Sequence, residues 1–113
     1  MVYMTKKEIR YYDSMSGSGR KYLEGMKQWL MDESMDKKKV PLCMQDWVLI
    51  DGEKNIPQQK NCVDCGMFSI IGADFLSDDL SLQYGQKDMP FFRNKVAAAI
   101  IGGSLSYPIL KVL

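Results

Sequence analysis

The sequence contains no histidine among its 113 residues. Imidazole is the usual general base of serine and cysteine hydrolases and a common metal ligand, so this absence excludes a complete Ser-His-Asp or Cys-His triad made by these residues alone. A catalytic hypothesis for this sequence must therefore explain how a nucleophile works without its own histidine.

The sequence also lacks an excess of one charge and a long apolar run. The 15 Lys and Arg residues nearly balance the 14 Asp and Glu residues, which leaves a net charge of +1. Charge therefore gives no reason to expect nucleic acid or an anionic membrane as a partner. The longest strongly apolar run, from Val96 to Gly103, is far shorter than the roughly 18 to 20 residues that a membrane span needs. We expect no nucleic-acid partner and no membrane partner.

Cysteine is limited to Cys43, Cys62 and Cys65. The count is odd, and the first residues lack the basic region and apolar segment of a secretory signal peptide. We therefore expect an intracellular protein whose thiols are reduced, so that the cysteines are packing residues, metal ligands or nucleophiles rather than a disulfide framework.

The first half of the sequence alternates strand and helix signals. Ile and Tyr residues predict a strand from Lys7 to Tyr12, followed by the turn-forming residues 13–19. A helix is predicted from Arg20 to about Lys37, with one buried apolar face. That face comprises Tyr22, Leu23, Met26, Trp29 and Leu30. A second short strand is predicted over residues 46–50, before a polar loop.

The second half predicts two further helices. One runs from Asp64 to about Leu76, with Asp64 as its N-cap and Cys65 as its first residue. The other has Asp88 as a candidate cap and ends at Gly102-Gly103. The tail after Gly103 shows no convincing period. This mixture predicts an α+β fold and a single domain over residues 1–113. The apolar faces of the helices need a larger sheet to pack against than these strands provide.

Cys65 is the best candidate nucleophile. A thiol at the first position of a helix meets unpaired N–H groups and a partial positive charge, which favour the reactive thiolate. The competing interpretation is a small buried hydrophobic residue on an apolar helix face. The polar loop before the helix could add the Gln59 side-chain amide to the backbone N–H of Cys65 and so form an oxyanion hole.

Three segments of the sequence resemble the ubiquitin-like-protein-specific cysteine proteases, a family that includes the SUMO (sentrin)-specific proteases. The nucleophile motif of this family is Gln-x-Asn-x-x-Asp-Cys-Gly, and residues 59–66 read QKNCVDCG. The family also has an aspartate at the end of a strand, in a phrase similar to residues 11–14, YYDS. A later family segment is similar to residues 88–93, DMPFFR. The resemblance covers roughly residues 9–103.

The resemblance implies a papain-like α+β fold and hydrolysis of a peptide or isopeptide bond after a Gly-Gly tail. Within it, Cys65 is the nucleophile, Asp13 is the triad acid that orients a histidine, and Gln59 is the side-chain oxyanion donor. It implies no cofactor and no metal. The implied partner is a ubiquitin-like protein, SUMO or a related one, and the implied location is the nucleus or cytoplasm.

The histidine of the family lies in a His-Trp strand upstream of the Tyr-Tyr-Asp-Ser phrase, and no residue here corresponds to it. We therefore expect residues 1–113 to be the C-terminal portion of a catalytic domain truncated on its N-terminal side, inactive as given. The main alternative is a module that binds a ubiquitin-like protein without cleaving it. More remote alternatives are a thiol oxidoreductase using Cys62 and Cys65, and a zinc site that adds Cys43.

Overall fold

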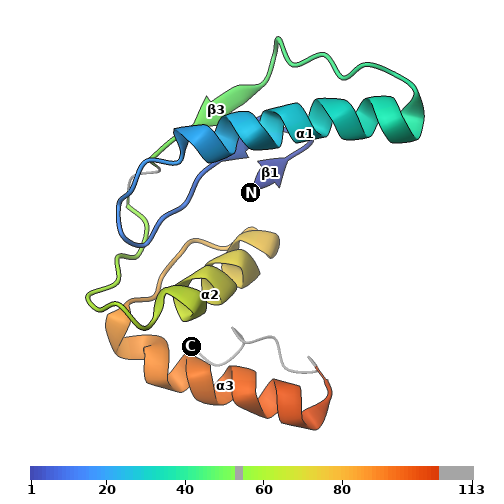
Figure 1. Ribbon diagram of the computed structural model, residues 1–113. Helices are drawn as coiled ribbons and strands as arrows, with labels where there is room; N and C mark the ends of the chain where they lie inside the picture. Colours follow the sequence, from blue (N-terminus) through green and yellow to red (C-terminus); the bar gives the residue numbers. More distant parts are fainter. Residues whose placement is uncertain (53–54, 105–113) are drawn as a thin grey trace. The chain divides into compact units, whose positions relative to one another are not determined.

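The computed structural model describes residues 1–52 and 55–104 (Figure 1). The chain divides into two compact units, Met1–Ile56 and Pro57–Leu113, and each is described by itself. The elements in chain order are β1 (Val2–Tyr3), β2 (Glu8–Arg10), α1 (Arg20–Lys38), β3 (Val48–Ile50), α2 (Cys65–Ser77), η1 (Gln86–Asp88) and α3 (Met89–Gly102). Apart from Ser104, the sequence prediction for the tail lies outside the described residues.

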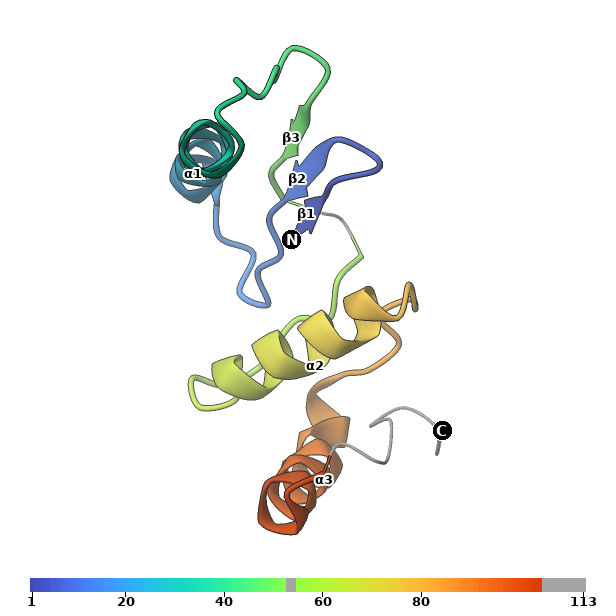
Figure 2. The same cartoon turned by 90° about the vertical axis from the view of Figure 1, so that its right-hand side faces the viewer.

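The first unit is a thin mixed sheet with one helix beside it. β2 is the central strand: it pairs antiparallel with β1 and parallel with β3. The parallel pair is possible because α1 carries the chain back to the start of β3, and Figure 2 shows α1 end-on next to the strands. Both predicted strands are confirmed in position but are shorter than expected. β1 was not predicted, because two residues give no period to read.

The start of α1 is fixed by a residue far away in the sequence. Asp51, just after β3, accepts hydrogen bonds from Ser18 Oγ and from the backbone N–H of Gly19, both at 2.7 Å. These bonds, led by the one from Gly19, hold the pKa of Asp51 below its usual range. Since Gly19 stands at the N-cap position without a side chain, Asp51 supplies the cap and ties the end of β3 to α1.

The prediction that α1 buries its whole apolar stripe is wrong. Leu23 is buried, but the Tyr22 and Trp29 side chains are 67% and 54% exposed, and Met26 is exposed as well. Within the first unit, α1 contacts β2, a strand of three residues. Such a narrow sheet covers about one turn of a helix of 19 residues. Tyr22 stacks on the Tyr11 ring, but Met26 and Trp29 stay exposed.

The second unit is built from α2, α3 and the short helix η1 between them. In Figure 2, α2 runs across the view while α3 is seen nearly end-on, so the two helices cross. Both helices were predicted, as was the ending of α3: Gly103 takes up the left-handed conformation that closes it, with φ 61°. Asp88 stands at the N-cap position of α3 without bonding to it. Its carboxylate accepts the backbone N–H of Gly85 instead, at 2.9 Å.

Apolar side chains of α2 and α3 form the core of the second unit. Its buried members are Met67, Phe68, Ile71, Phe75, Met89 and Phe92, and Leu82, Tyr84 and Val96 pack against them. The rings of Phe75, Tyr84 and Phe92 meet in tilted and edge-on contacts, the arrangements that aromatic pairs prefer. Each fully buried side chain of this size stabilises the fold by about 1.5–3 kcal/mol.

A tyrosine in this core also bonds to the helix backbone. Tyr84 Oη donates to the carbonyl oxygen of Phe68 at 3.1 Å. Gly72, on the next turn of α2, leaves room for this approach, since an added Cβ there would lie 3.0 Å from the Tyr84 hydroxyl.

The small mixed sheet and three helices agree with the α+β class. No helix within the described ranges is both long and apolar enough to cross a bilayer.

Candidate active site

Cys65 is the first residue of α2, as the sequence predicts. Its side chain is exposed, so the competing interpretation of Cys65 as a small buried hydrophobic residue is wrong. The buried face of the helix consists instead of Met67, Phe68, Ile71 and Phe75. An exposed thiol at a helix N-terminus is the arrangement in which a cysteine is most often reactive.

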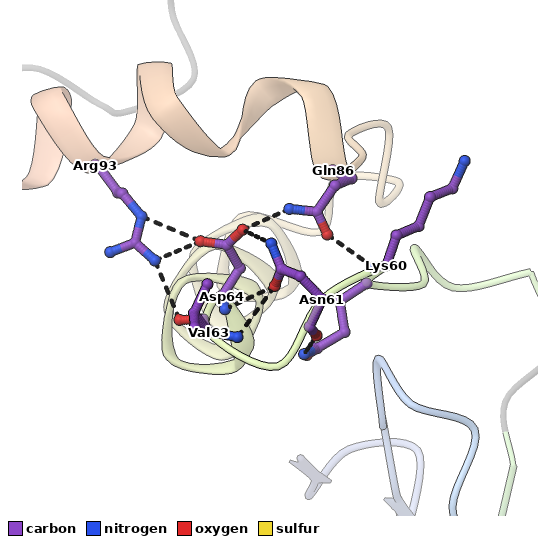
Figure 3. A network of polar contacts seen from close by, with 7 residues as sticks. Lys60, Asn61, Val63, Asp64, Gln86 and Arg93 are labelled. Carbon is purple, nitrogen blue, oxygen red and sulfur yellow. Dashed lines mark hydrogen bonds and ion pairs between the residues drawn. The ribbon is translucent and has the colours of Figure 1, made fainter.

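Asp64 stands at the N-cap position, as the sequence predicts, but its side chain does not bond to the helix. Its carboxylate is buried, with 6% of the residue exposed, and it accepts hydrogen bonds from three other side chains (Figure 3). The donors are Asn61 in the preceding loop, Gln86 in η1 and Arg93 in α3.

Asn61 shapes the loop that leads to Cys65. Its side-chain nitrogen donates to Asp64 Oδ2 at 2.6 Å. Its side-chain oxygen accepts the backbone N–H groups of Val63 and Asp64, at 3.1 and 3.0 Å, the local bonding by which asparagine mimics a backbone turn. Gln86 adds a second link, because its oxygen accepts the backbone N–H of Lys60 at 2.8 Å. The loop is therefore held at both ends.

Arg93 ties the helix start to α3. Arg93 Nε donates to Asp64 Oδ1 at 3.1 Å, and Nη2 forms an ion pair with the same oxygen. Nη2 also donates to the backbone carbonyl of Val63 at 3.1 Å. The hydrogen bond from Asn61 is the largest cause that lowers the pKa of Asp64, and the bonds from Arg93 and Gln86 add to it against the opposing effect of burial. Asp64 is thus held as a carboxylate.

The orientation of Asp64 leaves the start of α2 uncapped by its side chain. The first N–H groups of a helix have no partner inside the helix, and those of Cys65 and Gly66 lie next to the thiol in sequence. A Cβ built on Gly66 would meet no atom within 4 Å outside its own helix turn and chain neighbours. The site therefore offers a thiol, open N–H donors and the positive end of a helix dipole, which together can stabilise a developing oxyanion.

Gln59 lies in the loop on the same unit, where its side-chain nitrogen donates to the backbone carbonyl of Asn61. The amide nitrogen carries two protons, so this bond uses one of them. Its role as the second oxyanion donor stays a prediction.

Asp13 belongs to the first unit, in the loop after β2. Its carboxylate accepts the backbone N–H groups of Met15 and Gly17, each at 2.8 Å. A Cβ on Gly17 would come within 2.5 Å of Asp13 Oδ2, so a larger residue there would displace this carboxylate. The role of Asp13 as the triad acid stays a prediction.

The three cysteines are all free thiols. Cys62 and Cys65 lie in the second unit and Cys43 in the first. Across residues 1–52 and 55–104, no cluster of three or more Cys, Asp or Glu side chains could hold a metal ion.

Sequence reasoning missed the roles of two residues at this site. Arg93 was noted only as part of a family-like segment, and Gln86 carried no signal. Both contact Asp64 from 22 or more positions away in the sequence, and a polar residue on a helix surface is ordinarily read as solvated. The burial of Asp64, which makes these partners necessary, is visible only in the structure.

Comparison with known proteins identifies the family. The family model described as "Ulp1 protease family, C-terminal catalytic domain" matches residues 1–104. The chain is 36% identical over 102 residues to Sentrin-specific protease 2 of Homo sapiens, a match that covers 89% of this chain and 17% of that protein. It is 33% identical over 101 residues to Ubiquitin-like-specific protease 1A of Arabidopsis thaliana, covering 89% of this chain and 20% of that protein.

A relative from Caenorhabditis elegans, Sentrin-specific protease, is 31% identical over 105 residues, which cover 93% of this chain and 15% of that protein. The chain thus spans a fifth or less of the length of these relatives. The family match covers all of the described residues, including residues 59–66 with Cys65. The chain belongs to the Ulp1 protease family, in its C-terminal catalytic domain.

Proposed function

We propose that this chain carries the nucleophile side of a cysteine protease that cleaves the peptide or isopeptide bond after the Gly-Gly tail of a ubiquitin-like protein. The complete catalytic domain would have a papain-like α+β fold. The observation that carries the proposal is the exposed Cys65 thiol at the uncapped start of α2. The substrate would be SUMO or a related protein, met in the nucleus or cytoplasm, and the chemistry needs no cofactor.

In the proposed reaction, the Cys65 thiolate attacks the carbonyl carbon of the terminal glycine. A C–S bond forms and the negative charge moves to the carbonyl oxygen, where the Cys65 N–H and the Gln59 amide would stabilise it. Collapse of this intermediate expels the amine and leaves a thioester, which water then hydrolyses. The leaving amine must take up a proton, normally from the histidine that Asp13 would orient.

These 113 residues contain no histidine, so we expect them to be nearly inert by themselves. A free thiol is only a few per cent ionised at neutral pH. Asp13 would not replace the missing base, because a carboxylate near a thiolate repels it unless an imidazolium lies between them. Loss of the base costs up to about a millionfold in the best-studied serine protease.

The proposal is tested with a SUMO protein that carries a C-terminal electrophile, incubated at about pH 9, where the base is not needed to form thiolate. We expect labelling of Cys65, which is abolished in Cys65→Ser and retained in the matched control Cys62→Ser. Cleavage of an unmodified SUMO precursor at neutral pH should be below detection.

Other outcomes would contradict the proposal. Rapid mixed-disulfide formation with oxidised glutathione through Cys62 would support the oxidoreductase alternative. Binding of SUMO without labelling at the alkaline pH would support the non-catalytic module. Turnover of the precursor by this chain at a rate typical of proteases would contradict the role given to the histidine.

A further inference from the structure

We propose that Arg93 is a positioning residue that holds the Asp64 carboxylate away from the start of α2, so that the Cys65 thiolate and an oxyanion can use the helix N-terminus. This inference rests on the proposed role of Cys65 as nucleophile. Arg93 acts through Asp64 (Figure 3).

The sequence by itself favours a different arrangement. Aspartate is among the strongest N-cap residues, and at that position its carboxylate normally accepts the N–H of the second or third helical residue. Here those residues are Gly66 and Met67. A carboxylate in that place would occupy the N–H groups that a substrate oxyanion needs and would cancel part of the helix dipole.

The structure shows the aspartate held elsewhere. Arg93 donates from Nε and from Nη2 to Oδ1 of Asp64, and it also donates to the Val63 carbonyl. Oδ2 is used by Asn61 and Gln86. The backbone of Asp64, at φ −98° and ψ 5°, is likewise outside the extended conformation typical of capping residues. Side chain and backbone are therefore both drawn toward the network.

Arg93 differs from the other two donors in its charge. Asn61 and Gln86 satisfy the carboxylate but leave its negative charge beside Cys65. That charge disfavours the thiolate of the adjacent residue, since like charges repel. Arg93 compensates it with a guanidinium in direct contact. Removing Arg93 should therefore both release the carboxylate and leave it uncompensated.

The test measures the alkylation rate of Cys65 by iodoacetamide in the full 113-residue chain under reducing conditions, with each cysteine quantified by peptide mass spectrometry. Cys43, exposed in the other unit, is the internal reference in the same tube. At neutral pH we expect Arg93→Met to slow Cys65 relative to Cys43 by about fivefold, the size of a charge effect at a helix end.

The decisive variant is the double substitution Arg93→Met with Asp64→Ala. If Arg93 acts by restraining Asp64, removing the carboxylate restores the Cys65 rate to within about twofold of the original. If Arg93 merely supports the fold, the double variant is as slow as Arg93→Met or slower, and the proposal is overturned. Lys95→Met is the matched control: it removes a cation from α3 that lies over the Phe91 ring, and it should leave the rate unchanged.

Asp64→Ala alone keeps the test decisive if Arg93→Met does not fold, as judged by circular dichroism. With Arg93 left in place, loss of the carboxylate should raise the Cys65 rate, and a marked fall would overturn the proposal. Alkylation needs no SUMO recognition. Failure of the SUMO electrophile to label Cys65 would therefore count against the proposed function, whereas an unchanged rate in Arg93→Met would count against this inference.

Discussion

The two units of the chain are held together by different kinds of contact. In the described part of the first unit, two apolar side chains, Ile9 and Leu23, are buried, whereas six are buried in the second. The first unit relies on pairing of short strands, on the Asp51 cap and on one close fit, in which the Tyr11 ring lies against Gly19. The second unit has an apolar core directly beneath the helix that carries Cys65.

This difference shows which of the candidate residues is held by a packed core within its own unit. The Cys65 thiol and the loop before it are held by a core and a polar network within one unit. Asp13 is placed by a loop at the edge of a thin sheet. We therefore expect the second unit to tolerate local change less than the first, and the following variants test this.

The largest expected effect is on the core of the second unit. Phe92 is fully buried, so Phe92→Ala should cost about 3–5 kcal/mol of stability. Trp29→Ala in the exposed stripe of α1 is the matched control in the first unit and should change stability by less than about 0.5 kcal/mol. Hydrogen exchange of α1 and α2 amides in the same chain measures both. Equal costs for the two variants would remove the contrast between the units.

Gly19→Ala should give the largest effect in the first unit. A Cβ at this position would lie 2.0 Å from Cγ of the Tyr11 ring, which is close to its own backbone and cannot simply swing aside. We expect a cost of about 1–3 kcal/mol, typical of overpacking, seen as faster exchange in β2 and α1 with α2 unaffected. Gly25→Ala is the control, because nothing lies within 4 Å of the point where its new methyl group would stand. Protection lost in α2 would contradict the assignment of the Gly19 contact to one unit.

Acid should affect both units through one aspartate each. The pKa of Asp64 is lowered, first by its bond from Asn61, and that of Asp51 is lowered, first by its bond from Gly19. Both contributions are present above the ordinary value of about 3.9 and are lost as the pH falls through the lower folded value.

Unfolding measured from about pH 6 down to about pH 2 should therefore show the stabilities of the original chain and of Asp64→Asn converging at the acid end. The same should hold for Asp51→Asn. Added salt should weaken the effect of Asp51 more than that of Asp64, since Asp51 is exposed and Asp64 is buried. A difference between variants that does not depend on pH would contradict the assignment to ionised carboxylates.

The smallest expected effect is a gain. Asp74 Oδ2 in α2 is buried without a hydrogen-bond partner, and burial, with a smaller effect of Asp78, raises the pKa of Asp74. This carboxylate also lies toward the negative end of the helix dipole. Asp74→Asn should stabilise the second unit by about 0.5–1 kcal/mol near neutral pH, measured as a higher thermal midpoint. The gain should shrink as the pH falls, and a lower midpoint at neutral pH would contradict it.

Local sequence patterns predicted much of the fold. The helix from Arg20, the helix beginning at Cys65 and the glycine end of α3 follow from apolar spacing and from helix-terminating residues, which act within a few positions. The motif likewise placed Cys65 at the start of a helix, where the structure has it. These features require no knowledge of distant residues.

The features that local patterns missed share one physical cause: they depend on residues far away in the sequence. Asp64 stands at the predicted N-cap position, but its carboxylate accepts hydrogen bonds from Arg93 and Gln86 rather than from the helix start. Asp51, 32 positions from Gly19, caps α1 without any local signal. The burial of Trp29 was predicted from periodicity, which indicates a face suited to packing but not whether an element covers it.

The hydroxyl of Tyr84, bonded to the Phe68 carbonyl, gives the second unit a spectroscopic signal, which the difference from a Tyr84→Phe variant isolates from the other tyrosines. Burial raises the pKa of Tyr84 to about 12, whereas an unfolded tyrosine ionises near about 10. At a pH of about 11 this phenol is therefore neutral in the folded unit and ionised in the unfolded one, so folding stability declines as the pH rises through this interval. Ultraviolet absorbance of phenolate after a jump to alkaline pH would then report how fast the helices around Cys65 open.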